Sequence, residues 1–163
     1  MTQVTIRPFT PADADQLETI RAHAFAPVFA SFRALVGNDV ASVALANAEK
    51  EQQALLESLC AQTADTTVLV AARNGTAIGF LCIKLDRAQR VGEIVLDAVV
   101  PAEAGRGVGT ALVEHAIALM RAEGMRIAVV GVGGDESHTA ARRAYAKAGF
   151  RVGIPSIHLY RTL

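Results

Sequence analysis

Residues 93–109 read EIVLDAVVPAEAGRGVG, an apolar run that stops at Pro101 and is followed by a glycine-rich turn. The β-branched side chains of residues 93–100 predict a strand, and spacing typical of a helix begins near Val108. Glycines let a backbone approach a ligand closely, and the first amides of a helix have no partner inside it. The stretch therefore predicts a strand, an anion-binding turn and a helix, an arrangement that suits a phosphate or pyrophosphate group.

Two well-known phosphate loops do not fit this turn. A Walker loop needs a lysine directly after its second glycine, and residues 93–109 contain no lysine. A dinucleotide fingerprint needs Gly-x-Gly-x-x-Gly, and position 110 is Thr110 rather than glycine. The turn instead resembles the acetyl-coenzyme A loop of the GNAT acetyltransferase superfamily, Arg/Gln-x-x-Gly-x-Gly/Ala, with Ala104 at the usual Arg/Gln position.

A second motif supports the resemblance. GNAT enzymes carry a segment of the form Asn-x-x-Ala-x-x-x-Tyr-x-Lys-x-Gly-Phe after the strand that splays away from the central one. In this chain His138 replaces the asparagine, and the residues that match in register are Ala141, Tyr145, Lys147, Gly149 and Phe150. The two motifs occur in the family's order with one strand between them, so together they are far more specific than either alone.

Composition limits the class of protein. The chain has 163 residues, which suits one domain, and 52% hydrophobic with 20% charged residues is a globular composition. The formal net charge is zero, which argues against a nucleic-acid partner. No stretch approaches the roughly 20 apolar residues of a membrane span, and the amino terminus does not resemble a signal peptide. Cys60 and Cys82 lack metal-type spacing, so we expect reduced thiols, no metal and a cytoplasmic protein.

Periodicity and turn signals predict the order of elements. The expected elements are a strand at 4–7, a helix from Thr10-Pro11, a helix from 38 or 39 to about 60, strands 66–73 and 76–85 joined by Asn74-Gly75, the strand at 93–100, a helix at 108–123, a strand at 127–132, a helix at 139–148 and short strands at 150–154 and 157–160. The resemblance implies an α/β GNAT fold in a single domain, residues 1–163. Such a fold has a mixed sheet of about seven strands, a splayed V between its two central parallel strands, and about four helices on both faces.

Acetylation of an amine requires a base, because an alkylamine with a pKa of about 10.4 is almost wholly protonated at pH 7. Glu93 is the leading candidate, since the family's histone enzymes carry a glutamate at a similar place on the central strand. Asp97 lies four residues further on and points to the same face if the strand is regular, whereas a bulge would alter that parity. Tyr145 matches the family's general acid, which reprotonates the departing thiolate. The alternatives are an exposed Glu93 carboxylate, a structural Asp97 and a packing Tyr145.

The resemblance also implies a set of contacts to acetyl-coenzyme A. Backbone groups of Val99 and Val100 would pair with the pantetheine arm as an added strand does. The pyrophosphate would lie on the turn, whose members are Ala104, Gly105, Arg106, Gly107, Val108, Gly109 and Thr110. Because Ala104 removes a charged contact but no backbone donor, we expect weakened phosphate affinity. His138 and Ala141 stand where the family contacts the pantetheine, although a solvated His138 is an equal alternative.

The acceptor is the least determined part of the reaction. Phe25, Phe29 and Phe32 cluster ahead of Arg33, and they form either core packing or the wall of a substrate pocket with Arg33 or Asp39 as a polar contact. The principal expectation is an acetyl-coenzyme A dependent N-acetyltransferase that acts by direct attack of a small primary amine. The alternatives are a GNAT-like domain that senses acyl-coenzyme A without transfer, and an acetyltransferase for proteins or peptides. The last strands could pair across a homodimer, as they do in many relatives.

Overall fold

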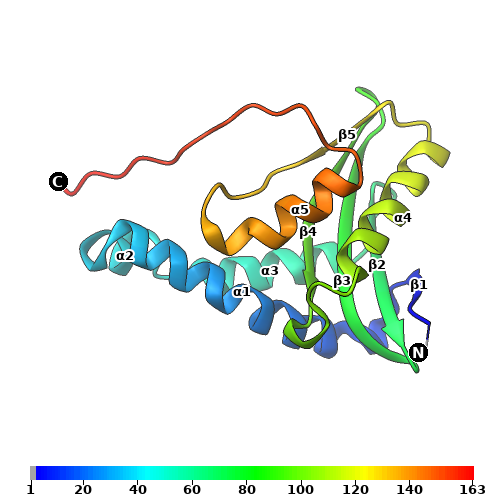
Figure 1. Cartoon of the computed structure of the whole chain (residues 1–163), viewed down its shortest axis with the longest axis horizontal. Coiled ribbons are helices and arrows are strands. Elements are labelled where there is room, and N and C mark those ends of the chain that lie inside the picture. Colours follow the sequence, from blue (N-terminus) through cyan, green and yellow to red (C-terminus); the bar gives the residue numbers. More distant parts are fainter. Residues whose placement is uncertain (1–2) are drawn as a thin grey trace.

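The computed structural model describes residues 3–163 and is organised around a five-stranded sheet with the order β1-β2-β3-β4-β5. Its strands are β1 (Thr5–Pro8), β2 (Thr66–Arg73), β3 (Thr76–Asp86), β4 (Val91–Val99) and β5 (Ile127–Val130). The first four strands pair antiparallel, and β5 pairs parallel with β4 (Figure 1). The sheet is therefore mixed, with its single parallel pair at one edge.

The hairpin predicted between β2 and β3 is confirmed. Asn74 and Gly75 have φ values of 52° and 81°, and the strands resume pairing at Arg73 and Thr76. Two central residues with positive φ make the type I′ turn, whose twist matches that of the flanking strands.

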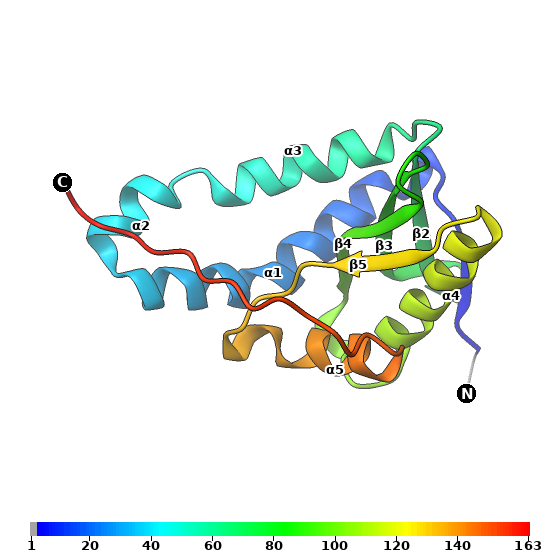
Figure 2. The ribbon, with the colours of Figure 1, turned by 90° about the horizontal axis from the view of Figure 1, so that it is seen from above.

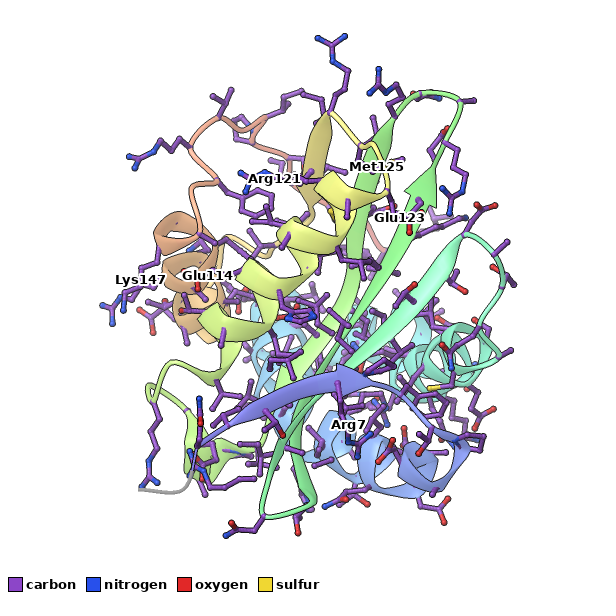
Figure 3. The ribbon with its side chains drawn as sticks, turned by 90° about the vertical axis from the view of Figure 1, so that its right-hand side faces the viewer. Arg7, Glu114, Arg121, Glu123, Met125 and Lys147 are labelled. Atoms are coloured by element: carbon purple, nitrogen blue, oxygen red, sulfur yellow. The ribbon has the colours of Figure 1, made fainter. Side chains whose placement is uncertain are left out.

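Helices cover both faces of the sheet (Figure 2). On one side lie α1 (Ala14–Val36), entered through the 3₁₀ turn η1 (Pro11–Asp13), and α3 (Ala48–Cys60), with α2 (Asn38–Ala44) at the far end of α1. On the other side α4 (Val108–Ala122) and α5 (Thr139–Lys147) pack side by side; Figure 3 shows their labelled residues Glu114 and Lys147. The helix predicted from residue 38 to 60 is interrupted, because Leu45 and Asn47 leave the helical conformation and Asn47 begins α3 as its N-cap.

The sheet separates two apolar cores, and the alternation of β3 shows which residue enters which. Phe80 and Cys82 pack against α1 and α3, whereas Leu81 and Ile83 pack against α4. Strands that are buried on both faces are apolar without a break, as β3 is from Ala77 to Ile83. The same alternation decides on which face each side chain of β4 lies.

An ion pair joins the edge strand β1 to the start of the first helix. Arg7 donates from Nη1 and Nη2 to the two carboxylate oxygens of Asp13, at 2.8 and 2.6 Å, and Asp13 also accepts from the Thr10 amide at 2.8 Å. Figure 3 shows Arg7 on β1. This two-pronged contact fixes the entry into α1.

The two strands predicted at 150–154 and 157–160 are not present. Residues 151–163 have no regular secondary structure and are exposed throughout, so the sheet has five strands in the described chain rather than about seven. Figures 1 and 2 show this segment leaving α5 and running extended toward the end of the molecule occupied by α2. The segment runs away from the sheet and pairs with none of the strands within residues 3–163 (Figure 1). Over the same residues, no helix has the length and apolarity to cross a bilayer.

Candidate active site at the split between β4 and β5

The two parallel strands are paired over only half of β4. Residues Val91–Ile94 pair with Ile127–Val130, and from Val95 onward β4 has no partner on that edge among residues 3–163. The backbone pattern shows which groups are free there. Val100 donates its amide to the Ile78 carbonyl at 2.9 Å, so in the antiparallel alternation the backbone of Val99 faces the open edge. Of the two predicted backbone contacts, Val99 is available, whereas the Val100 amide is occupied.

The glycine-rich turn forms the end of this split. Gly105 and Gly107 have φ values of 75° and 84°, and a Cβ on either would meet no atom within 4 Å, so the backbone conformation and not space requires glycine there. Gly107 is the N-cap of α4, and Ala111 donates the first intrahelical bond to its carbonyl at 2.9 Å. The amides of Val108, Gly109 and Thr110 precede that bond and are free to bind an anion.

Two arginines near the turn compete for one carboxylate. Arg73 Nη1 lies 2.6 Å from Glu103 Oε1, whereas Arg106 Nη1 lies 3.8 Å from the same oxygen. The Arg106 side chain is 63% exposed, in contrast to that of Arg73. Glu103 is therefore held mainly by Arg73, and Arg106 remains able to turn toward a ligand. Ala104 is exposed and offers no charged group.

Tyr145 and Asp97 meet across the split. Tyr145, on α5, donates from Oη to Asp97 Oδ1 on β4 at 2.6 Å, and its ring contacts Phe150 edge-on. Burial raises the pKa of Asp97, an effect that the Tyr145 hydrogen bond and the charge of His138 partly oppose. Burial, the Asp97 charge and the same hydrogen bond all raise the pKa of Tyr145. The phenol therefore stays protonated and the carboxylate holds a proton more readily than an ordinary aspartate.

Glu93 and Asp97 do not share a face, because β4 is not a regular strand. Cys82 pairs with Leu96 and Ile83 pairs with Ile94, so β4 has a bulge with Val95 as its extra residue. As a result Ile94 enters the core beside α4, whereas Leu96 enters the core beside α1 and α3. Their neighbours Glu93 and Asp97 consequently lie on opposite faces of the sheet. Glu93 is exposed, away from the Tyr145 hydroxyl.

A cluster of side chains around His138 lies between α1 and the start of α5. His138 Nδ1 lies 2.7 Å from Asp135 Oδ1, and the imidazole stacks on the Phe32 ring of α1 with 5.7 Å between centroids. Asp135 Oδ2 accepts from the hydroxyls of Ser31, at 2.7 Å, and of Ser137. Burial would raise the pKa of Asp135, but the bonds from Ser137, Ser31 and His138 outweigh it and lower that pKa. His138 is thus a fixed and mostly buried side chain, not a solvated one.

The other phenylalanines of α1 lie elsewhere. Phe25 packs against Phe29 with 6.3 Å between ring centroids, and the Arg33 guanidinium lies over the Phe29 ring. Arg33 is itself paired with Glu49 of α3 at 2.6 Å. Among the predicted acceptor residues, Phe32 contacts the His138 cluster, whereas Phe25 packs against the core between the helices and the sheet and Arg33 joins α1 to α3. Ala141 packs against the core beside α4.

Asp135 and Ser31 were not predicted from the sequence. An aspartate three residues before a histidine at a helix start is a pattern that indicates a local hydrogen bond, so the Asp135–His138 spacing was a usable signal. Ser31 had no such signal, because 104 positions separate it from Asp135.

The geometry fits coenzyme A. A free strand edge at Val99 suits an extended chain of amides, and the free amides of the turn suit its pyrophosphate. Within residues 3–163, no three His, Cys, Asp or Glu side chains come together to hold a metal ion.

Comparisons with known proteins agree with this fit. A sequence model of the acetyltransferase (GNAT) family matches residues 36–150. A mycothiol acetyltransferase of Streptomyces griseus subsp. griseus is 32% identical over 93 residues, which cover 57% of this chain and 29% of that enzyme. The chain thus spans less than a third of that relative.

Two solved structures share the fold. PaiA N-acetyltransferase of Thermoplasma acidophilum, in complex with coenzyme A, has a TM-score of 0.75 at 18% identity and covers 94% of this chain and 93% of its own. A GNAT family acetyltransferase of Brucella melitensis, in complex with acetyl-CoA, has a TM-score of 0.65 at 25% identity, with 93% and 85% covered.

Proposed function

The chain belongs to the GNAT acetyltransferase family, and on that premise we propose that it transfers the acetyl group of acetyl-coenzyme A to a small primary amine by direct attack. The observation that carries the proposal is the hydrogen bond between Tyr145 and Asp97, at 2.6 Å, beside the unpaired edge of β4. A domain that only sensed acyl-coenzyme A would need the turn and the open strand edge, but no proton donor paired with a carboxylate between them.

The cosubstrate supplies an acetyl group activated as a thioester, and the chain supplies the contacts that hold it. The backbone of Val99 would pair with the pantetheine amides, and the free amides of Val108, Gly109 and Thr110 would bind the pyrophosphate. Arg106 adds a mobile positive charge, and a helix end contributes about 0.3 to 1 kcal/mol where it is exposed. The loss of a charged side chain at Ala104 weakens this binding without abolishing it.

Asp97 and Tyr145 move one proton as a unit. Asp97, whose pKa burial raises, accepts a proton that leaves the attacking nitrogen, directly or through water. Tyr145 donates its hydroxyl proton to the departing sulfur and takes the proton held by Asp97 across their 2.6 Å hydrogen bond. This assigns the base to Asp97 instead of Glu93, which lies on the other face of the sheet.

The contacts between α1 and the turn before α5 favour a small acceptor. Ser31 and Phe32 of α1 contact Asp135 and His138, so α1 is joined to this turn. A peptide would need an open groove between α1 and the turn before α5. We assign Phe32 and His138 to the wall against which the amine lies.

The C-terminal segment supports a homodimer. Val152, Ile154, Ile157 and Leu159 are at least 79% exposed, and the edge strand β5 also exposes Ile127 and Val129. A hollow next to this edge is lined by Ile117, Met120, Met125, Ile127 and Ala128, among others. Exposed apolar side chains on this scale, beside an open strand edge, mark an association site. We assign the segment of one copy to the β5 edge of a second copy.

Light scattering during gel filtration tests the dimer. The full chain is expected to elute at twice the mass of one chain, and a variant that ends at Phe150 to elute as a monomer. A full chain that stays monomeric would contradict the proposed dimer.

We further propose that residues 1–163 form one domain and that the protein is cytoplasmic.

The test of the transfer reaction is amine-dependent release of free coenzyme A thiol, with the acetylated product identified by mass spectrometry. A panel of polyamines, amino sugars, amino acids and one lysine peptide spans the acceptor classes. Turnover of one small amine, lost in Tyr145→Phe, is the expected result. Tight binding of acetyl-coenzyme A without turnover of any amine would indicate a sensor, and turnover of the peptide alone would overturn the small acceptor.

A further inference from the structure

The proposed reaction leaves one proton without a route. An alkylammonium carries three N–H bonds and the amide product carries one, so two protons leave the nitrogen. The pair of Asp97 and Tyr145 delivers one of them to the sulfur. The second must reach solvent, and Tyr145 is buried. A second proton acceptor that contacts both the amine and the solvent is therefore required.

His138 is the side chain placed for this task. It is the N-cap of α5 and stands seven residues before Tyr145, about two helical turns or 10 Å along the helix axis. The side chain is 16% exposed, which leaves it a contact with water. The charge of His138 also acts on the pKa of Asp97, so the imidazole lies within electrostatic range of the proposed proton path.

Its partners fix which nitrogen is the base. Asp135 Oδ1 lies 2.7 Å from Nδ1, and the pKa of Asp135 is lowered, so this carboxylate is ionised and accepts a hydrogen bond from Nδ1–H. An imidazole that donates from Nδ1 has its lone pair on Nε2. The Asp135 carboxylate stabilises the imidazolium that forms when Nε2 takes a proton, as in the aspartate–histidine pairs of other enzymes.

Contacts on several sides hold the imidazole of His138 in place. Phe32 stacks on one face of the ring, and Ser31 and Ser137 hold Asp135. A Cβ on Gly133 would lie 2.6 Å from His138 Cε1 and 2.8 Å from Asp135 Oδ1, so only glycine at 133 leaves room for both. Arg142 donates to the Asp135 carbonyl at 2.7 Å and closes the turn.

We propose that His138, oriented by Asp135, accepts the first proton of the incoming ammonium through Nε2, directly or through one water, and passes it to solvent. This rests on the proposed function. The neutral amine then forms the bond to the acetyl carbon, and the C–S bond breaks. The second proton leaves nitrogen to Asp97 and reaches the sulfur through Tyr145. The charged groups facing His138 are Asp135 in its own turn, Arg142 on α5 and Asp97 on β4.

The pH dependence of kcat/KM for the amine tests the assignment. A base must be neutral to act, so we expect kcat/KM to rise with pH in the wild type. In His138→Gln the rise is lost and kcat/KM falls by about 10² to 10⁴, the usual contribution of a base. His115→Gln, an exposed histidine on α4, is the matched control and should behave as wild type.

A second acceptor sharpens the kinetic test. An amine that is already neutral at the assay pH does not need its first proton removed, so the defect of His138→Gln should shrink with that amine. A purely structural defect would be the same for both acceptors. The assignment is overturned if His138→Gln keeps the pH dependence, or if its defect is confined to the KM for acetyl-coenzyme A, which would indicate a contact to the pantetheine.

A measurement without turnover separates this inference from the proposed function. Nitrogen-15 NMR of the histidine side chains, assigned by difference with His138→Gln, reports which ring nitrogen carries the proton. Protonated Nδ1 with free Nε2 supports the assignment, whereas a proton on Nε2 in the neutral ring overturns it. If no amine is acetylated by the wild type, the proposed function fails while the NMR result still decides the state of His138.

Discussion

The hydroxyl of Tyr145 lies 2.6 Å from the carboxylate of Asp97, so a single hydrogen bond joins α5 to β4. Both elements flank the open edge of β4, and the glycine turn between β4 and α4 ends the same split. In the proposed reaction, this pair supplies the proton that the departing thiolate takes up.

Removal of the hydroxyl tests the donor role. Tyr145→Phe keeps the ring and its contact with Phe150, so acetyl-coenzyme A binding measured by calorimetry should change less than threefold. The rate should fall by about 10² to 10⁴, because the thiolate must leave without a proton. An unchanged kcat would show that Tyr145 only packs in the core.

The turn can be tested with two glycines two positions apart. Gly107 has φ of 84°, a conformation that costs a residue with Cβ about 1 to 2 kcal/mol, so Gly107→Ala should raise the Kd for coenzyme A roughly five- to thirtyfold. Gly109→Ala is the control, since φ there is not positive and the new Cβ would lie 3.9 Å from Val99 Cγ2, an ordinary contact. Equal losses measured by calorimetry in both variants would mean that the φ of Gly107 does not set affinity.

A second pair of glycine variants tests how tightly the side chains around His138 are packed. Gly133→Ala places a methyl group against His138 and Asp135, and such overpacking costs about 1 to 3 kcal/mol. Gly134→Ala meets no atom within 4 Å and should change the free energy of unfolding by less than about 0.5 kcal/mol. Urea unfolding of the two variants measures this contrast, and similar stabilities would show that the cluster is not tightly packed.

The ion pair of Arg7 and Asp13 predicts a pH dependence of stability. The hydrogen bonds from Arg7, above all, lower the pKa of Asp13 against the effect of burial, and an unfolded aspartate has a pKa of about 3.9. The pair therefore stabilises the fold fully above that unfolded value, and the contribution is lost as the pH falls through the lower folded value. Asp13→Asn should be less stable than wild type at pH 7, and the gap should narrow at pH 3. Urea unfolding that gave the same gap at both pH values would contradict this origin.

Local rules were sufficient where the sequence itself carries the signal. The Asn74-Gly75 hairpin and the turn from Gly105 to Gly109 follow from residues that accept positive φ, and both occur where expected. The helix that carries Tyr145 occurs at Thr139–Lys147, close to the predicted range of 139–148.

Features that depend on contacts between distant segments could not be predicted from the local sequence. The bulge at Val95 depends on how β3 meets β4, and it moves Glu93 to the face opposite Asp97. Ser31 reaches Asp135 only because α1 lies against the turn before α5. The apolar pattern of residues 151–163 reads as two strands, yet a strand also requires an available edge, which this chain does not bring to it.

A double-mutant cycle on kcat tests most directly whether Asp97 and Tyr145 act as one unit. Asp97→Asn, Tyr145→Phe and the double variant are compared with wild type at saturating acetyl-coenzyme A and amine. If the two side chains pass one proton between them, the double variant should be about as slow as the slower single variant, since the second change removes nothing more. Rate losses that multiply in the double variant would show that the two groups act independently, and the proposed proton path would be wrong.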